Sequence, residues 1–213
     1  MVTRTGLASF VGAVVIAITV GCGAASADDV YHDHSETWSY RVDITYPLDY
    51  PDAAAVSDFV AADRQEFVDW VAEVGPDGRN RPYTYDVSAK TYRSAQPATQ
   101  SLVLTIDNDT GAVHQGHPET SFKTFTFDLT KRAPVTFDTL LRPEAKPLDV
   151  LTSIVRRELH APTLELLPSD FRNFAITDDA VVFFFGEGQL IPGENNGPHQ
   201  ISVPRSELAP LMA

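Results

Sequence analysis

Two short apolar runs near the C-terminal end of the chain constrain its fold more than any other segment. The runs cover residues 173–177 and 181–186, and Asp178 and Asp179 lie between them. Both runs are rich in β-branched and aromatic residues, which favour strands, and the acidic pair favours a turn. The second run contains three consecutive phenylalanines from Phe183, so it is apolar on both faces. The sequence therefore predicts a hairpin whose second strand is buried in the core of a sheet.

The spacing of apolar residues predicts a further strand and two helices. Residues 38–46 alternate strictly between apolar and polar side chains, as in a strand with one buried face. A helix is expected from near Asp52, which can cap it, to Gly75, because the apolar residues between them fall on one helical face. A second helix is expected from Pro147, with an apolar side that ends at Leu159.

The rest of the chain adds short strands separated by turns. Strand patterns cover residues 83–92, 101–107 and 122–129, a short strand ends at Phe137, and a short helix covers residues 206–211. Strands and helices do not alternate regularly, which predicts an α+β fold. We expect a single domain in which an antiparallel or mixed β-sheet packs with two main helices. A domain of this size buries about 70% of its unfolded surface, enough for a core without disulfides.

The N-terminal segment has the features of an export signal. Arg4 precedes an apolar stretch over residues 7–20, which is too short for a comfortable transmembrane helix. Cleavage after Ala27 fits the small-x-small rule of signal peptidase, whereas Cys22 fits a lipobox whose lipid would anchor the protein to the membrane. Both alternatives place the protein outside the cytoplasm. The expected organisation is an export signal (1–27), a flexible tether (28–37) and one folded domain (38–213).

Strong acidity narrows the range of partners. The formal net charge of −13 repels phosphate backbones, so nucleic acid is not expected to bind. We expect a protein or small-molecule ligand, and contact with a membrane only through a lipid on Cys22. No cofactor is expected and no metal site is assigned, because His32 and His34 would bind a metal only weakly from a flexible tether.

The C-terminal hairpin belongs to a series of motifs that covers nearly all of the chain beyond residue 38. They include Tyr-Pro-Asp at 50–52, Asn-Phe-Ala-Ile-Thr-Asp-Asp at 173–179, Val-Pro-Arg-Ser at 203–206, Thr-Tyr-Arg-Ser-Ala at 91–95, Gly-His-Pro at 116–118 and Pro-Val-Thr-Phe-Asp-Thr-Leu at 134–140. In these motifs the chain resembles the secreted mycobacterial immunogenic antigens and their cell-wall esterase relative. More distantly, it resembles the lysozyme-binding extracellular domain of certain anti-sigma factors. The cysteine pair that this family often carries near the mature N-terminus is absent here, since Cys22 is the only cysteine.

The segment with the most chemical potential covers residues 111–118. The sequence has no Gly-x-Ser-x-Gly elbow, P-loop, His-Glu-x-x-His motif or dinucleotide fingerprint, so whether the protein is an enzyme stays open. The resemblance implies that His117 is a general base or, together with His114 and Gly116, a ligand contact. The alternative is that His117 holds this loop by a hydrogen bond to the backbone.

If the resemblance to the esterase extends to catalysis, a serine needs a base within hydrogen-bond distance and a carboxylate behind that base. Ser94 and Ser206 lie in family-like motifs and are the candidate nucleophiles, with Asp138 and Asp179 as candidate carboxylates. Sequence spacing brings none of these residues together. The structural alternative is that Asp138 caps a helical turn and Asp179 makes the hairpin turn.

Three functions are therefore open for an exported protein of this kind. The antigen family implies a binding domain for an unknown ligand. The esterase relative implies a cell-wall-associated carboxylesterase. The more distant relative, together with the acidic surface, implies lysozyme binding.

Overall fold

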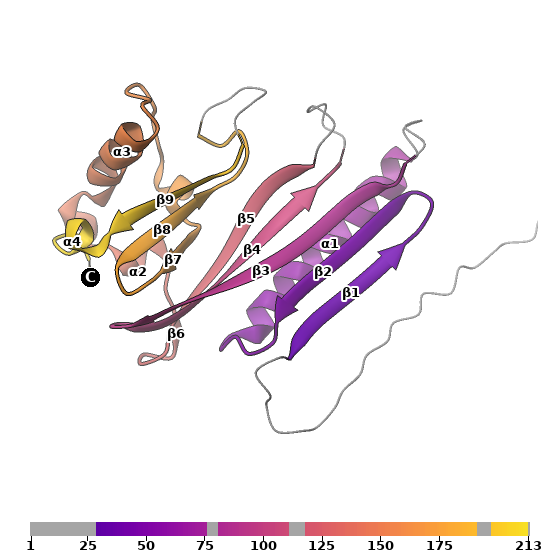
Figure 1. The fold of residues 1–213 in the computed structure, drawn as a ribbon, viewed down its shortest axis with the longest axis horizontal. Coiled ribbons are helices and arrows are strands. Elements are labelled where there is room, and N and C mark those ends of the chain that lie inside the picture. Colours follow the sequence, from indigo (N-terminus) through magenta and orange to yellow (C-terminus); the bar gives the residue numbers. More distant parts are fainter. Residues whose placement is uncertain (1–28, 76–80, 111–117, 191–196, 213) are drawn as a thin grey trace, which may run out of the picture.

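The structure, a computed structural model, describes residues 29–75, 81–110, 118–190 and 197–212 (Figure 1). Within these ranges the strands are β1 (Val30–Glu36), β2 (Tyr40–Pro47), β3 (Tyr83–Ala95), β4 (Ala98–Asn108), β5 (Glu119–Asp128), β6 (Ala133–Pro134), β7 (Phe174–Ile176), β8 (Ala180–Phe185) and β9 (His199–Pro204). The α-helices are α1 (Ala53–Val74), α2 (Phe137–Leu140), α3 (Pro147–Glu158) and α4 (Arg205–Leu208), and short 3-10 turns cover η1 (Pro143–Ala145) and η2 (Pro168–Phe171).

The strands form two separate sheets. The first sheet has the order β1-β2-β3-β4-β5-β6 and is mixed, because β2 and β3 are parallel while the other neighbours are antiparallel. The parallel pair is joined through α1, as a parallel pair requires a long crossover. The second sheet has the order β7-β8-β9 and is antiparallel. The fold is thus α+β with two main helices, as predicted, but its strands divide between two sheets.

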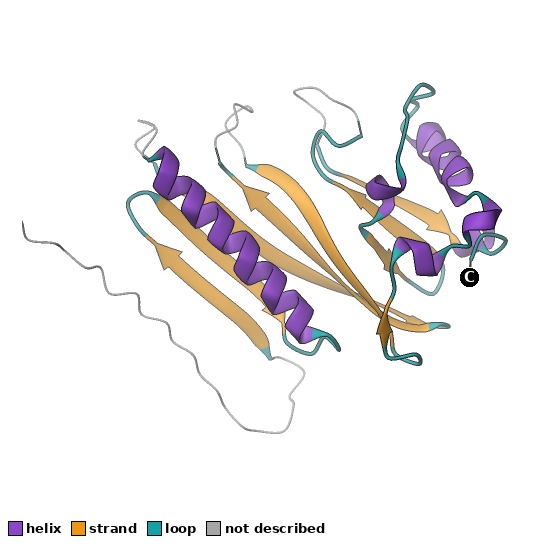
Figure 2. Cartoon of the chain, turned by 180° about the vertical axis from the view of Figure 1, so that it is seen from behind, coloured by secondary structure: helices purple, strands orange, loops and turns teal. Residues whose placement is uncertain are grey.

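The elements are stacked in four layers. Helix α1 covers one face of the six-stranded sheet, where Ile44, Phe67 and Leu104 belong to a common core (Figure 2). The second sheet packs on the opposite face of the first through Val103 and Phe184. The far face of the second sheet packs against α2, α3 and α4. Strand β8 is therefore buried on both faces, which confirms the prediction from its three phenylalanines.

The main helices begin and end where the local sequence favours it. Asp52 is the N-cap of α1 and its carboxylate accepts a hydrogen bond from Ala55 N at 3.4 Å. Gly75 ends the helix with φ of 68°, a conformation that glycine adopts without strain, and its N–H donates to Val71 O at 2.9 Å. Helix α3 begins at Pro147, as predicted. In the part of the chain described, no helix is both long enough and apolar enough to cross a membrane.

The segment predicted to be a flexible tether, residues 28–37, is largely a strand. Strand β1 pairs along its full length with β2, with His34 opposite Asp43. On the side facing α1, the Arg64 guanidinium donates to Asp33 at 2.9 Å and to Ser35 at 3.3 Å. The sequence prediction was wrong here because an edge strand that is polar on both sides lacks the apolar alternation by which strands are recognised.

Candidate functional site

Ser94, the first candidate nucleophile, lies near the tip of the long β3–β4 hairpin and is buried, with 5% of its surface exposed. Its Oγ donates to Asp178 Oδ1 at 3.2 Å and accepts from Arg205 Nη1 at 3.3 Å. Ala95 N donates to the same carboxylate oxygen at 2.7 Å, and Arg205 also donates to the carbonyl oxygen of Gln96. No histidine in the described ranges contacts Ser94. The cluster joins the hairpin tip to the second sheet, which is the role of a structural clamp.

The other candidate residues are not brought together with Ser94 into a triad. Ser206 is exposed in α4, and Asp179 is exposed in the β7–β8 turn, where its carbonyl oxygen accepts from Arg205 N at 2.8 Å. The clamp therefore uses the side chain of Asp178 and the backbone of Asp179. Asp179 lies in the hairpin turn, as the structural alternative to a catalytic role predicted. Asp138 lies in the first turn of α2, but the N-cap of that helix is Thr136, so Asp138 is not the cap. His114, Gly116, His117 and Cys22 lie outside the described residues.

A cleft with a volume of about 540 Å³ opens between the α1 side of the molecule and the helical C-terminal part. Asp138 is the candidate residue that lines it. Strand β5 contributes Lys123 to Thr126, the N-terminal end of α1 contributes Tyr50, Asp52 and Ala55, and the opposite side consists of residues 134–138 with Pro168 and Arg172. The cleft thus combines aromatic and aliphatic walls with charged groups of both signs.

The wall next to α1 is formed by Tyr50 and Lys123. The ring of Tyr50 packs edge-on against Phe125 and Phe127, with centroids 6.2 and 6.5 Å apart. Burial, and secondarily the nearby Asp52 carboxylate, raises the pKa of Tyr50 well above its usual range, so this phenol is neutral at physiological pH. The Lys123 ammonium lies 5.0 Å from the centroid of the Phe59 ring and 5.5 Å from that of Phe125, where it interacts with their π faces.

Asn173 protects the edge of β5 that forms one side of the cleft. Its side-chain Nδ2 donates to Phe122 O at 2.9 Å, and its Oδ1 accepts from Thr124 N at 3.1 Å. The amide therefore pairs with the strand as a neighbouring backbone would. The next residue, Phe174, donates its N–H to Thr124 Oγ1 at 3.0 Å. This explains why the Asn-Phe motif precedes the hairpin, and it joins the two sheets beside the cleft.

A buried hydroxyl pair continues this junction. Thr126 Oγ1 lies 3.0 Å from both Ser101 Oγ and the carbonyl oxygen of Phe174, and Ile176 N donates to Ser101 Oγ at 3.1 Å. Ser101 is fully buried and Thr126 is 4% exposed, so these bonds are shielded from water. Buried polar groups specify one packing when all are satisfied, so this junction fixes how the second sheet sits on the first.

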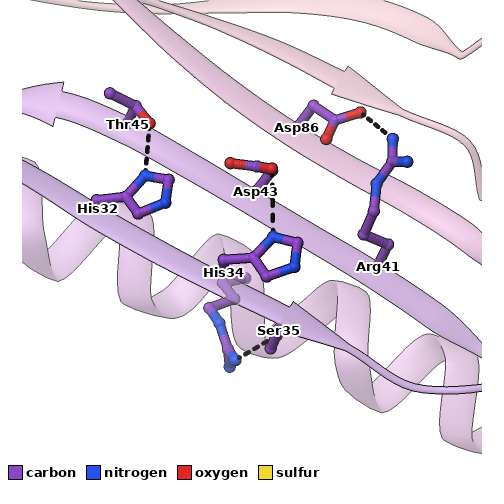
Figure 3. Close-up of polar contacts among 8 residues, drawn as sticks. His32, His34, Ser35, Arg41, Asp43, Thr45 and Asp86 are labelled. Atoms are coloured by element: carbon purple, nitrogen blue, oxygen red, sulfur yellow. Dashed lines mark hydrogen bonds and ion pairs between the residues drawn. The ribbon is translucent and has the colours of Figure 1, made fainter. Parts of the chain in front are cut away.

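The face of the first sheet that lies opposite α1 is polar over β1 to β3 (Figure 3). His32 Nδ1 is 3.0 Å from Thr45 Oγ1, and His34 Nδ1 is 3.3 Å from Asp43 Oδ2. Arg41 donates to Asp86 at 3.5 Å. Burial raises the pKa of the Asp86 carboxyl, which Arg41 opposes and the neighbouring Asp43 reinforces.

The two histidines of β1 do point to the same side, as an extended chain requires. Their ring nitrogens nevertheless bond to neighbours on β2, and within the described ranges no group of three or more potential ligands could hold a metal ion. No grouping of the described side chains identifies a particular cofactor either. Among the described residues, those that line the cleft between α1, β5 and α2 form the candidate site.

Fold and cleft together define a two-sheet α+β protein with a side cleft, and comparisons with known proteins assign its family. The chain is 39% identical over 200 residues to a protein named Esterase Rv3036c from Mycobacterium tuberculosis, covering 89% of this chain and 86% of that protein. It is 36% identical over 186 residues to the immunogenic proteins MPB64 of Mycobacterium bovis and MPT64 of Mycobacterium tuberculosis, covering 82% of this chain and 79% of each of those proteins. The chain belongs to the family of these mycobacterial proteins.

A family described as a protein of unknown function, DUF3298, matches residues 138–206. Crystal structures of DUF3298 proteins have the same fold. The protein from Bacteroides fragilis has a TM-score of 0.54 at 11% identity, with coverage of 88% of this chain and 94% of that chain. The protein from Pseudomonas aeruginosa has a TM-score of 0.56 at 13% identity, with coverage of 86% and 94%.

Sequence reasoning missed most of the cleft. Lys123, Arg172 and Tyr50 come from segments far apart in the chain, and none lies in a chemical motif. Tyr50 does lie next to Pro51 in one of the motifs that resemble the family, and this motif was the one sign in the sequence that pointed to the cleft. Lys123 interrupts the apolar side of a predicted strand, but a single lysine in a strand has no functional meaning by itself.

Proposed function

We propose that the protein works outside the cytoplasm as a binding protein that takes a small organic ligand into the cleft between α1, β5 and α2. The single observation that carries this proposal is the cleft itself, of about 540 Å³, with apolar walls and a few charged groups. Ligand sites have volumes of about 300–1,000 Å³ and this kind of lining. The export signal in the sequence and the kinship with the immunogenic proteins support the location.

The test is to fill the cleft. Ala55 lines it, whereas its neighbour Ala54 is exposed and does not. In two-dimensional NMR titrations with a panel of small aromatic compounds, we expect shifts at Lys123–Phe125 and Val135–Asp138. Ala55→Trp should abolish them, and Ala54→Trp, the matched control on the same helical turn, should leave them. Shifts confined to other regions, or equal binding by the two variants, would overturn the proposal.

Ester hydrolysis is the second candidate, favoured by the name of the relative at 39% identity. Ser94 is the described serine that has a carboxylate partner, but it is buried and bonded to Arg205 rather than to a histidine. We therefore expect slow turnover of 4-nitrophenyl butyrate that changes less than about threefold in Ser94→Ala, and equally little in Ser206→Ala. A loss of about 10³-fold in one variant with an unchanged melting temperature would establish catalysis by that serine.

Lysozyme binding stays a prediction from the sequence resemblance.

A further inference from the structure

The two cationic side chains in the cleft differ from several others in the described part of the chain. Among the described residues, Arg41, Arg64 and Arg93 each pair with a carboxylate. Within the same ranges, neither Lys123 nor Arg172 has such a partner. Lys123 interacts with aromatic rings, and the Arg172 side chain is exposed at the mouth of the cleft.

The charges of the cleft also differ from those of the whole chain. The protein has a formal net charge of −13, yet the lining contains two cations, Lys123 and Arg172, against two carboxylates, Asp52 and Asp138. The Asp52 carboxylate is already engaged as the N-cap of α1. Within the described ranges, the cleft is therefore a place where an acidic molecule leaves two cationic groups available to an incoming anion.

The walls between these charges are apolar. Phe125 and Phe137 face the cleft together with Val135 and Pro168, and the neutral Tyr50 phenol completes this surface. A small inorganic anion would leave these walls in contact with water. A ligand that covers them needs an apolar body in addition to its charged group.

We infer that the ligand class of this cleft is an organic anion, in which an apolar body carries a carboxylate that meets Lys123 and Arg172. This inference rests on the proposed function and specifies it. The guanidinium of Arg172 can donate two parallel hydrogen bonds to a carboxylate, and the Lys123 ammonium can add a third. The aromatic rings under Lys123 hold its ammonium at the wall, which reduces the cost of ordering it.

The inference is tested with three probes that share one apolar body: 4-phenylbutyrate, 4-phenylbutanol and 4-phenylbutylamine. Binding is followed by the NMR shifts of the cleft residues in the full mature protein. We expect the carboxylate to bind at least about tenfold more tightly than the alcohol, since hydrogen bonds to charged groups contribute on that scale. The amine should bind most weakly. Raising the salt concentration should weaken only the carboxylate, because screening acts on its ionic contacts.

Substitutions assign the effect to the two cations. Lys123→Gln and Arg172→Gln should each lower the affinity for 4-phenylbutyrate by about tenfold and leave that for 4-phenylbutanol within about twofold. Lys123→Arg should retain the carboxylate preference. The matched control is Lys90→Gln, because Lys90 also lies over a ring, 4.8 Å from the centroid of Tyr92, but outside the cleft lining. Melting temperatures of all variants show whether they are folded.

Each outcome decides between the two proposals. If the alcohol binds at the cleft as tightly as the carboxylate, the inference about the anion is wrong and the binding cleft stands. If the carboxylate preference survives in both glutamine variants, other groups hold the anion and the inference is again wrong. If none of the three probes shifts the cleft residues, the inference fails together with the proposed function.

Discussion

Phe184→Ala tests how the two sheets are held together. Phe184 is 1% exposed and packs between the sheets, with ring centroids 5.9 Å from Tyr92 and 5.4 Å from Phe122. Truncation removes a whole ring and leaves a cavity between two sheets whose backbones are fixed by hydrogen bonds. Substitutions of this kind cost about 3–5 kcal/mol. Because Tyr92 and Phe122 are only partly buried and can move into the space, we expect a value toward the lower end.

Urea unfolding followed by far-ultraviolet circular dichroism and by tryptophan fluorescence measures this loss. Trp70 packs edge-on against Tyr83 at 5.0 Å, so its emission reports on the α1 side of the first sheet. Since β3 and β4 contribute to the cores on both sides of that sheet, the two signals should change together in the variant. Leu129→Ala, at a side chain that is 43% exposed, is the control and should cost well under about 1 kcal/mol. A loss below about 1 kcal/mol for Phe184→Ala would refute the burial argument, and two separate transitions would show that the halves unfold independently.

Three further predictions concern the edge of β5, the anchor and the tyrosines. Asn173→Ala should cost about 1–3 kcal/mol in the same urea assay, because it leaves backbone groups of β5 without partners, whereas Asn173→Asp should retain the acceptor and lose less. If Cys22 carries a lipid, Cys22→Ser should release the protein from the membrane fraction, and a wild-type mature chain that begins at Asp28 by N-terminal sequencing would contradict this. Burial raises the pKa of the Tyr50 and Tyr85 phenols in the folded state. Their contribution to stability is therefore complete below the pKa of the unfolded chain, near 10, and is lost as the pH rises above that pKa. Absorbance at 295 nm should show these two phenols ionising only when the protein unfolds.

Where apolar residues are periodic, the sequence predicted the fold well. The alternation over residues 38–46 became β2, except that Trp38 lies before the strand and is 75% exposed. The stretch between Asp52 and Gly75 became α1 with its predicted cap and end. The acidic pair at Asp178 forms the turn between β7 and β8, as predicted. Each of these depends on local chemistry, which a sequence displays directly.

What the sequence did not reveal depends on contacts between distant residues. Strand β1 exists because polar groups such as His34 find partners on β2, and its own pattern contains no sign of this. The division into two sheets depends on Ser101 and Thr126 meeting the backbone of β7. Likewise, the partner of Ser94 proved to be Asp178 rather than Asp179, because the β3–β4 hairpin is long enough to reach the turn of the second sheet.

The strand that replaces the expected tether determines how far the protein could stand from a membrane. With β1 starting at Val30, the chain between Cys22 and the folded domain spans roughly 28 Å even when fully extended, at about 3.5 Å per residue. A lipid on Cys22 would therefore hold the domain within about one bilayer thickness of the lipid surface and restrict its ligands to those that reach this layer. Cleavage after Ala27 would instead leave a chain that enters the sheet within its first few residues. A fusion or affinity tag at that terminus would adjoin the edge of β1 directly.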